Sequence, residues 1–161
     1  MSNNINGDNM YIKDIMSKSL IIGSITNNLT EIAIMMKKYD IGFLPISDQK
    51  KIVGIITDRD IVVNALSNNC SQNDIIDKYI VKNIISIDQD KKIEDAIKLM
   101  GEKKIRRLIV TKDNKISGIL SLADIISINN YKDLINDNLQ KIFEINRNDD
   151  LFKTEIDEFY L

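Results

Sequence analysis

The sequence predicts an α+β (α/β) fold built from one supersecondary unit that occurs twice. Residues 15–64 align with residues 79–128 at a constant offset of 64 and without a gap, which is the pattern expected of an internal repeat. In both copies a helical stripe of apolar residues alternates with short apolar runs of strand length. These observations predict two similar lobes packed about a pseudo-twofold axis, with a groove between them.

Each unit reads as strand, helix, strand, strand, helix (β-α-β-β-α). A short apolar run opens the unit, and apolar residues at i, i+3, i+4 and i+7 then predict an amphipathic helix, as from Leu29 to Met36. Two further apolar runs, separated by a polar turn, predict a pair of strands. The predicted strands are 20–22, 43–47, 52–56, 84–87, 108–111 and 116–120, the helical stripes are 29–36 and 93–100, and the closing helices are 58–66 and 122–127.

The chain divides into four parts. A polar lead-in at 1–10 precedes the first repeat at 11–68 and the second at 69–128, and a helix with an acidic tail fills 129–161. The helical stripe of this last part runs over 131–145. Two alternatives remain open for it: the helix packs on its own core, or the part is a contact for a partner or a second copy. The tail beyond the helix mixes acids with Leu151, Phe152, Ile156, Phe159 and Leu161.

Charge and composition exclude several classes of function. Residues 129–161 hold eight acidic and four basic side chains, net −4, which leaves 16 acidic and 18 basic elsewhere, net +2. No broad basic face therefore indicates nucleic-acid binding. No apolar run approaches the roughly 18 residues of a membrane span, so we expect a cytoplasmic protein that contacts neither nucleic acid nor membrane.

The absence of histidine argues against catalysis. It removes Ser-His and Cys-His nucleophilic pairs and the commonest transition-metal ligand. Cys70 is the single cysteine, and no base is at hand to activate it. An enzyme that uses Asp58 and Asp60 with a metal is the remaining catalytic alternative, and it lacks further oxygen ligands of suitable spacing. We therefore expect no enzyme, no catalytic residue and no bound metal.

One frame recurs where each buried strand meets its closing helix. It reads Gly-apolar-apolar-Thr/Ser-x-x-Asp-Ile and begins at Gly54 and at Gly118. Thr57 with Asp60, and Ser121 with Asp124, have the spacing of a capping box, worth about 1 kcal/mol per cap. The same hydroxyl and carboxylate can instead contact the phosphate and ribose of a nucleotide. The two interpretations are compatible, because an empty protein can use the groups as caps.

Two intact copies of this frame, with Ile15-Met16-Ser17 ahead of the first helix and Gly42-Phe43-Leu44-Pro45-Ile46 after it, resemble a tandem CBS-domain pair, the Bateman module, of the stand-alone bacterial type. The resemblance covers about residues 11–128. It implies β-α-β-β-α units that pack through their sheets, commonly form homodimers, and bind adenine nucleotides in the clefts between units. The implied regulatory ligand is AMP, ADP or ATP, with NAD or S-adenosylmethionine as further options, and no cofactor is required.

The resemblance also implies two sites of unequal quality. In the first, Thr57 contacts phosphate, Asp60 contacts ribose, and two arginines reach the phosphate. The implied residues are Thr57, Asp60, Ile55, Ile84, Ile85, Arg106, Arg107 and Ile109. The second, weaker site is formed by Ser121, Asp124, Ile119, Leu20, Ile21, Pro45 and Arg59. It is weaker because Gly42 and Phe43 occupy the positions that match the two arginines.

The basic run 103–107 has two possible roles. Cations at a helix end are commonly solvated and complement the negative helix terminus, whereas arginine side chains are well suited to bind phosphate.

The predicted function is a regulatory module that senses an adenine nucleotide and signals to an unknown regulated protein by dimer or tail rearrangement. The alternative is a structural or scaffolding dimer with non-functional clefts and a partner-binding tail.

Overall fold

The computed structural model describes residues 10–128 and 131–143. The lead-in at 1–9 and the tail at 144–161 lie outside the described residues. The first unit contains β1 (Gly23–Ser24), α2 (Leu29–Tyr39), β2 (Phe43–Asp48), β3 (Lys51–Thr57) and α3 (Asp58–Asp60), which continues as a π-helix at Ile61–Ala65 and a 3₁₀-helix at Leu66–Asn68. The second contains β4 (Ser86–Asp88), α4 (Ile93–Lys103), β5 (Arg107–Lys112), β6 (Lys115–Ser121) and α5 (Leu122–Ile126). Three elements flank the units: α1 (Ile12–Ile15), a 3₁₀ turn at Ile76–Lys78, and α6 (Lys132–Phe143).

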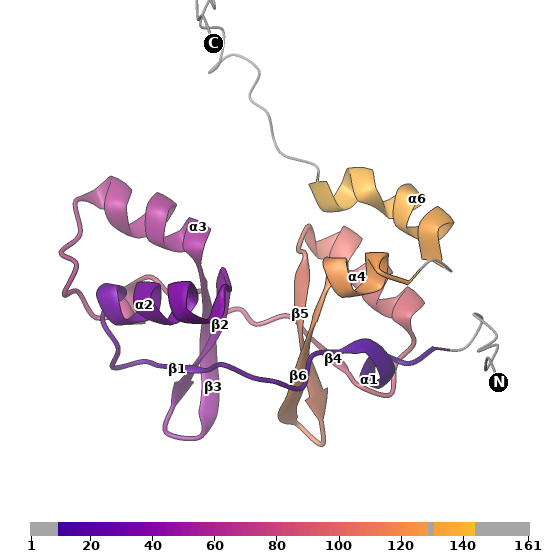
Figure 1. Ribbon diagram of the computed structural model, residues 1–161, viewed down its shortest axis with the longest axis horizontal. Helices are drawn as coiled ribbons and strands as arrows, with labels where there is room; N and C mark the ends of the chain where they lie inside the picture. Colours follow the sequence, from indigo (N-terminus) through magenta and orange to yellow (C-terminus); the bar gives the residue numbers. More distant parts are fainter. Residues whose placement is uncertain (1–9, 129–130, 144–161) are drawn as a thin grey trace, which may run out of the picture.

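Each unit forms a three-stranded sheet of the same topology. The orders are β1-β2-β3 and β4-β5-β6, and in each sheet the first pair of strands is parallel and the second antiparallel. The antiparallel pairs carry a bulge between Ile46 and Ser47 and between Val110 and Thr111, again 64 residues apart. The lobes lie side by side with their sheets toward the middle of the molecule (Figure 1). The predicted fold class and order of elements are therefore confirmed.

The leading segment of each repeat packs in the core of the other lobe. Ile12 and Met16 come from the N-terminal segment, yet they are buried in the core of the second lobe. Ile76 and Ile80, at the equivalent positions of the second repeat, are buried in the core of the first. Backbone bridges between Ser17 and Ile119, and between Ile55 and Val81, attach the two segments to the opposite sheets.

Glycine at the start of each recurring frame makes this attachment possible. A Cβ on Gly118 would lie 2.8 Å from the carbonyl oxygen of Ser17 and 2.7 Å from the sulfur of Met16. A Cβ on Gly54 would lie 3.0 Å from the carbonyl oxygen of Val81. Both positions require the absence of a side chain, because the crossing segment passes directly over them.

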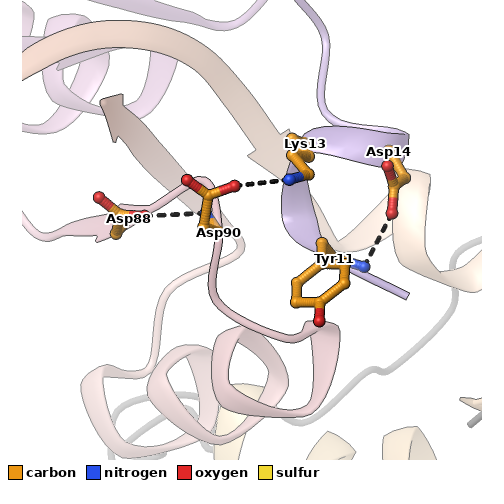
Figure 2. Close-up of polar contacts among 5 residues, drawn as sticks. All are labelled: Tyr11, Lys13, Asp14, Asp88 and Asp90. Atoms are coloured by element: carbon orange, nitrogen blue, oxygen red, sulfur yellow. Dashed lines mark hydrogen bonds and ion pairs between the residues drawn. The ribbon is translucent and has the colours of Figure 1, made fainter. Parts of the chain in front are cut away.

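Polar contacts fix the N-terminal segment to the second lobe (Figure 2). The ammonium of Lys13 contacts the carboxylate of Asp90 in the second lobe at 2.7 Å. Within the segment itself, the backbone N–H of Tyr11 donates to Asp14 at 2.9 Å and caps α1. The Lys13 contact holds the pKa of Asp90 below its ordinary value, and Asp90 in turn raises the pKa of Lys13. This exposed pair adds an electrostatic contact to the apolar anchor supplied by Ile12.

Helix α6 packs on its own chain, which confirms the first alternative for the helical part of the C-terminal region. Ile135 and Ile142 are buried in the core of the second lobe, and α6 lies against α4. Gly101 leaves room for this contact, since a Cβ there would lie 3.1 Å from Oδ1 of Asn138.

Among the described residues, no helix is long and apolar enough to cross a membrane. The tail residues Ile145, Leu151, Phe152, Ile156, Phe159 and Leu161 lie outside the described residues.

Three details of the prediction were wrong. The strand expected at 20–22 is shifted to Gly23–Ser24, because residues 17–22 span the distance from the sheet of one lobe to the sheet of the other. The strand expected at 84–87 occupies Ser86–Asp88. Helix α1 was not predicted, because four residues with one buried side chain give no helical periodicity.

Candidate functional site

A cleft between the lobes brings together all eight residues of the expected first site. Its volume is about 330 Å³. It is formed where β3 passes into α3, where the segment 81–85 crosses between the lobes, and where α4 turns into β5. Its lining residues are Phe43, Ile55, Thr57, Asp58, Arg59, Asp60, Val81, Asn83, Ile84, Ile85, Lys104, Ile105, Arg106, Arg107 and Ile109.

Thr57 and Asp60 form a complete capping box at the base of α3. The Thr57 hydroxyl donates to Oδ2 of Asp60 at 2.6 Å, and the Asp60 N–H donates to that hydroxyl at 3.1 Å. The Thr57 N–H also donates to Oδ2 of Asp60, at 2.9 Å. Oδ1 of Asp60 accepts only a longer hydrogen bond, 3.2 Å, from the exposed Asn64 amide. The carboxylate therefore has acceptor capacity that the cap does not use.

The apolar wall of the cleft comes from both lobes. Ile55 lies on β3, Ile109 lies on β5, and Ile84 and Ile85 lie on the crossing segment. Ile109 is 4% exposed, and the other three are partly buried. The bridge between Ile55 and Val81 holds the crossing segment against β3. These side chains thus form an apolar surface in the same cleft as the polar groups of Thr57 and Asp60, a combination typical of small-molecule sites.

Cationic side chains also line the cleft. Lys104 ends α4 in the left-handed conformation (φ 54°), and the chain then turns so that Arg106 and Arg107 enter the cleft at the start of β5. The Arg106 guanidinium lies 5.8 Å from the ring centroid of Phe143 at the end of α6. Both arginines are exposed. Their charge is therefore accessible to an anion in the cleft.

Arg59 differs from its expected place. It was assigned to the second site, but the structure places it on the wall of the first cleft. The reason is local: α3 starts directly after Thr57, so its second residue stands beside the same cleft as Thr57. With Arg59, the lining residues include four basic side chains and two acidic ones, Asp58 and Asp60, a net charge of +2.

Several lining residues were not among the expected site residues. Phe43 pairs with Thr57 across β2 and β3, and its ring lies under the guanidinium of Arg107 at 5.8 Å. Strand register would have revealed this neighbour. Lys104 was considered only as part of a basic run. The others are Asp58, Val81, Asn83 and Ile105, and the sequence pattern carries no signal that sets Val81 and Asn83 apart from other loop residues.

The second expected site repeats the capping contact but lacks its cations. The Ser121 hydroxyl donates to Oδ2 of Asp124 at 2.6 Å, as in the first unit. At the position of Arg106 the first repeat has Gly42, where a Cβ would lie 2.5 Å from Oδ2 of Asp58. No side chain fits there while Asp58 keeps this conformation. Of the remaining residues assigned to this site, Pro45 is buried, and Leu20, Ile21 and Ile119 are partly buried.

Comparisons with known proteins agree with the fold. A duplicated β-α-β-β-α unit with a cleft between its lobes is typical of tandem-repeat modules that bind ligands. The family model described as the CBS domain matches residues 12–66 and 74–130. The chain therefore belongs to the CBS-domain family and carries two of its domains in tandem.

Among curated proteins, the chain is 31% identical over 116 residues to the uncharacterized protein YlbB of Bacillus subtilis (strain 168), covering 71% of this chain and 78% of YlbB. It is 31% identical over 115 residues to hypoxic response protein 1 of Mycobacterium tuberculosis (strain ATCC 25618 / H37Rv), covering 70% of this chain and 80% of that protein. CBS-domain proteins are typically regulatory, and these relatives carry no enzymatic name.

Two solved structures are similar in both fold and sequence. The crystal structure of Hypoxic Response Protein I with two coordinated zinc ions has a TM-score of 0.66 and 30% identity, and covers 74% of this chain and 98% of that chain. The CBS domain pair of protein MJ0100, in complex with 5′-methylthioadenosine and S-adenosyl-L-methionine, has a TM-score of 0.67 and 31% identity, and covers 73% and 98%. These comparisons support a ligand-binding regulatory module.

Proposed function

We propose that this chain is a regulatory module that binds an adenine nucleotide in the first cleft. The observation that carries the proposal is the convergence of three kinds of group on one cavity of about 330 Å³. The lining residues include a hydroxyl and a carboxylate at Thr57 and Asp60, a group of isoleucines, and the guanidinium groups of Arg106 and Arg107. A nucleoside phosphate presents the matching groups: a diol, a flat apolar base and an anionic tail.

Binding exchanges the capping contacts for ligand contacts. The adenine ring lies against Ile84, Ile85 and Ile109, and the ribose hydroxyls donate to the Asp60 carboxylate. The Thr57 hydroxyl, which donates to Asp60 at 2.6 Å in the structure, turns to donate to a phosphate oxygen. The arginines neutralise the phosphate by charge-assisted hydrogen bonds.

The charge of the cleft favours a phosphorylated ligand. The MJ0100 pair is described with S-adenosyl-L-methionine and methylthioadenosine, of which the first carries a sulfonium cation. Four basic side chains against two acidic ones repel that cation and attract phosphate. We therefore expect ATP and ADP to bind more tightly than AMP, and AMP more tightly than S-adenosylmethionine, with NAD as a further option.

Zinc, found in the hypoxic response protein structure, is not part of the proposal, because this chain has no histidine and no cluster of three candidate ligands among its described residues.

Signalling requires a partner, and the proposal includes one. The module acts in the cytoplasm as a homodimer, and ligand binding alters its contact with an unidentified regulated protein. A ligand can shift such an equilibrium only by its differential affinity for the two states. The competing function is a scaffolding dimer, favoured by the fact that both capping boxes are completed by groups of the chain itself.

Isothermal titration calorimetry of the full chain with ATP, ADP, AMP, NAD and S-adenosylmethionine tests the proposal. Asp60→Ala is expected to weaken the tightest ligand strongly. Asp124→Ala is the matched control, since it removes an equivalent cap contact from the second lobe and should leave that affinity unchanged. If none of the five ligands binds at millimolar concentration, while both variants lower the melting temperature equally, the scaffolding function replaces the nucleotide sensor.

A further inference from the structure

The mouth of the first cleft touches the end of the last helix. The ring of Phe143, the final residue of α6, lies 5.8 Å from Cζ of Arg106, which also lines the cleft. Phe143 is 48% exposed. The chain therefore leaves α6 at the rim of the cleft, beside one of its cations. The sequence continues for 18 residues beyond this point, which reach about 60 Å when extended.

The charge of this C-terminal segment, residues 144–161, is opposite to that of the cleft. The segment contains six acidic and two basic side chains, net −4, whereas the lining residues of the cleft have a net charge of +2. The remainder of the protein has no such acidic excess: the chain as a whole is −2, so residues 1–143 are +2. The net negative charge of the chain thus comes from the segment directly after the helix that ends at its cationic cleft.

The segment also carries apolar groups that match the isoleucines of the cleft. Phe152, Ile156 and Phe159 alternate with pairs of acids such as Asp149 and Asp150. The cleft is lined both by isoleucine side chains and by guanidinium groups. A peptide with acids and large apolar residues in alternation can contact both surfaces at once, whereas a purely acidic peptide would contact only one.

We infer that the C-terminal segment of the same chain occupies this cleft, against its basic side chains, when no other anion is bound. Because it begins beside Arg106, its local concentration at the cleft is high, and this favours the intramolecular contact over a free anion of similar charge. A phosphorylated ligand must displace the segment in order to bind. The inference shares its cleft with the proposed function, but occupation by the segment does not itself require a nucleotide.

Carbodiimide cross-linking of the full chain tests occupation directly. The reagent joins carboxylates to lysines without a spacer, and peptide mapping then locates the bonds. Tail acids are expected to link to Lys104, which lines the cleft, about fivefold more often than to Lys98, an exposed lysine on α4 that does not. Inorganic tripolyphosphate should suppress the Lys104 bonds. Three outcomes would each overturn the inference. The cross-links could be spread evenly over the lysines, or tripolyphosphate could leave them unchanged. In a mixture of isotopically labelled and unlabelled protein, they could also form only between different chains.

Ligand affinity tests the competition. The variant Asp149→Asn/Asp150→Asn/Asp157→Asn/Glu158→Gln is expected to bind ATP about fivefold more tightly than the wild type, within the usual range of coupling between sites. The control Asp40→Asn/Asp48→Asn/Glu102→Gln/Asp113→Asn changes the net charge equally at exposed positions outside the tail. Equal affinities for the two variants overturn the competition. If ATP binds neither variant nor the wild type, the nucleotide proposal fails, while the cross-linking result still decides whether the segment occupies the cleft.

Discussion

The guanidinium of Arg107 lies over the ring of Phe43, with Cζ 5.8 Å from the ring centroid. The two residues occupy equivalent positions in the two repeats, 64 residues apart. Equivalent residues can touch only near the axis that relates the repeats, so this pair marks the pseudo-twofold axis of the molecule. It also explains why the clefts differ: one repeat supplies a cation at this position and the other supplies the aromatic face that supports it.

Arg107→Gln is expected to weaken ATP binding about tenfold or more, because a hydrogen bond to a charged group contributes roughly 1.5–3 kcal/mol. The loss should increase from AMP to ATP and diminish at high salt, since it concerns phosphate. Titration calorimetry at two salt concentrations measures both effects. Phe43→Leu is the control that keeps the cation and removes the aromatic support, and it should have a smaller effect. Wild-type affinity in Arg107→Gln would exclude this arginine from the site.

Thr57→Ala and Ser121→Ala are a matched pair, because the two hydroxyls make the same capping contacts. Each is expected to lower the free energy of unfolding by about 1 kcal/mol, measured by urea denaturation. The pair should differ in the presence of ATP. Only Thr57→Ala should lose part of the ligand-induced rise in melting temperature. Equal losses in both variants would mean that the two clefts bind equally.

Gly118→Ala is expected to destabilise the protein by about 1–3 kcal/mol, because the added methyl group would lie 2.8 Å from the Ser17 carbonyl oxygen. Ser117→Ala is the neighbouring control. The Ser117 hydroxyl is buried and has no hydrogen-bond partner among the described residues, so its removal should cost nothing or stabilise the fold. Chemical denaturation of both variants gives the comparison. A stable Gly118→Ala protein would contradict the close passage of the N-terminal segment.

The Lys13–Asp90 pair predicts a pH dependence with a defined sign. Its contact with Lys13 lowers the pKa of Asp90 from the ordinary 3.8. A carboxyl group whose pKa is depressed on folding stabilises the protein above its unfolded pKa, and this stabilisation is lost as the pH falls through the folded value. At the alkaline end, the raised pKa of Lys13 means that its contribution is present below 10.5 and lost as the pH rises further.

The stability difference between wild type and Asp90→Asn should therefore be constant from pH 5 to pH 9, because both groups of the pair are charged throughout this range. The difference should decline below about pH 4. Denaturation at a series of pH values measures it. Asp113→Asn, an exposed aspartate in the β5–β6 turn, is the control and should show no such profile. A difference that persists unchanged at pH 2 would mean that the ion pair is not its source.

The ungapped alignment of the two copies predicted the repeated elements, whereas the eight expected residues of the first cleft came from the resemblance to the CBS-domain family. Once Thr57 is placed at the end of a strand, the same offset places Ser121 at the end of the equivalent strand, but strand register pairs Arg107 with Ser121 and not with Thr57. What the sequence did not predict depends on contacts between the lobes. The apolar run 20–22 resembles a strand, yet it belongs to the crossing between two sheets, and its hydrogen bonds depend on where that crossing ends.

The misplaced Arg59 has a similar cause. The assignment rested on which site lacked cations, whereas the observed position follows from the direction in which α3 leaves Thr57. The π-helical turn after α3 was also not visible in the pattern, because its apolar residues fit an ordinary helix equally well. Local periodicity specifies that a helix follows the frame, and tertiary packing decides its hydrogen-bond pattern.

The exchange of leading segments means that neither repeat is a complete folding unit. A fragment that began after residue 17 would leave the second core without Ile12 and Met16, and a fragment that ended before residue 76 would leave the first without Ile76 and Ile80. A cut in the loop between the repeats would therefore leave two halves, each with a core completed by residues of the other.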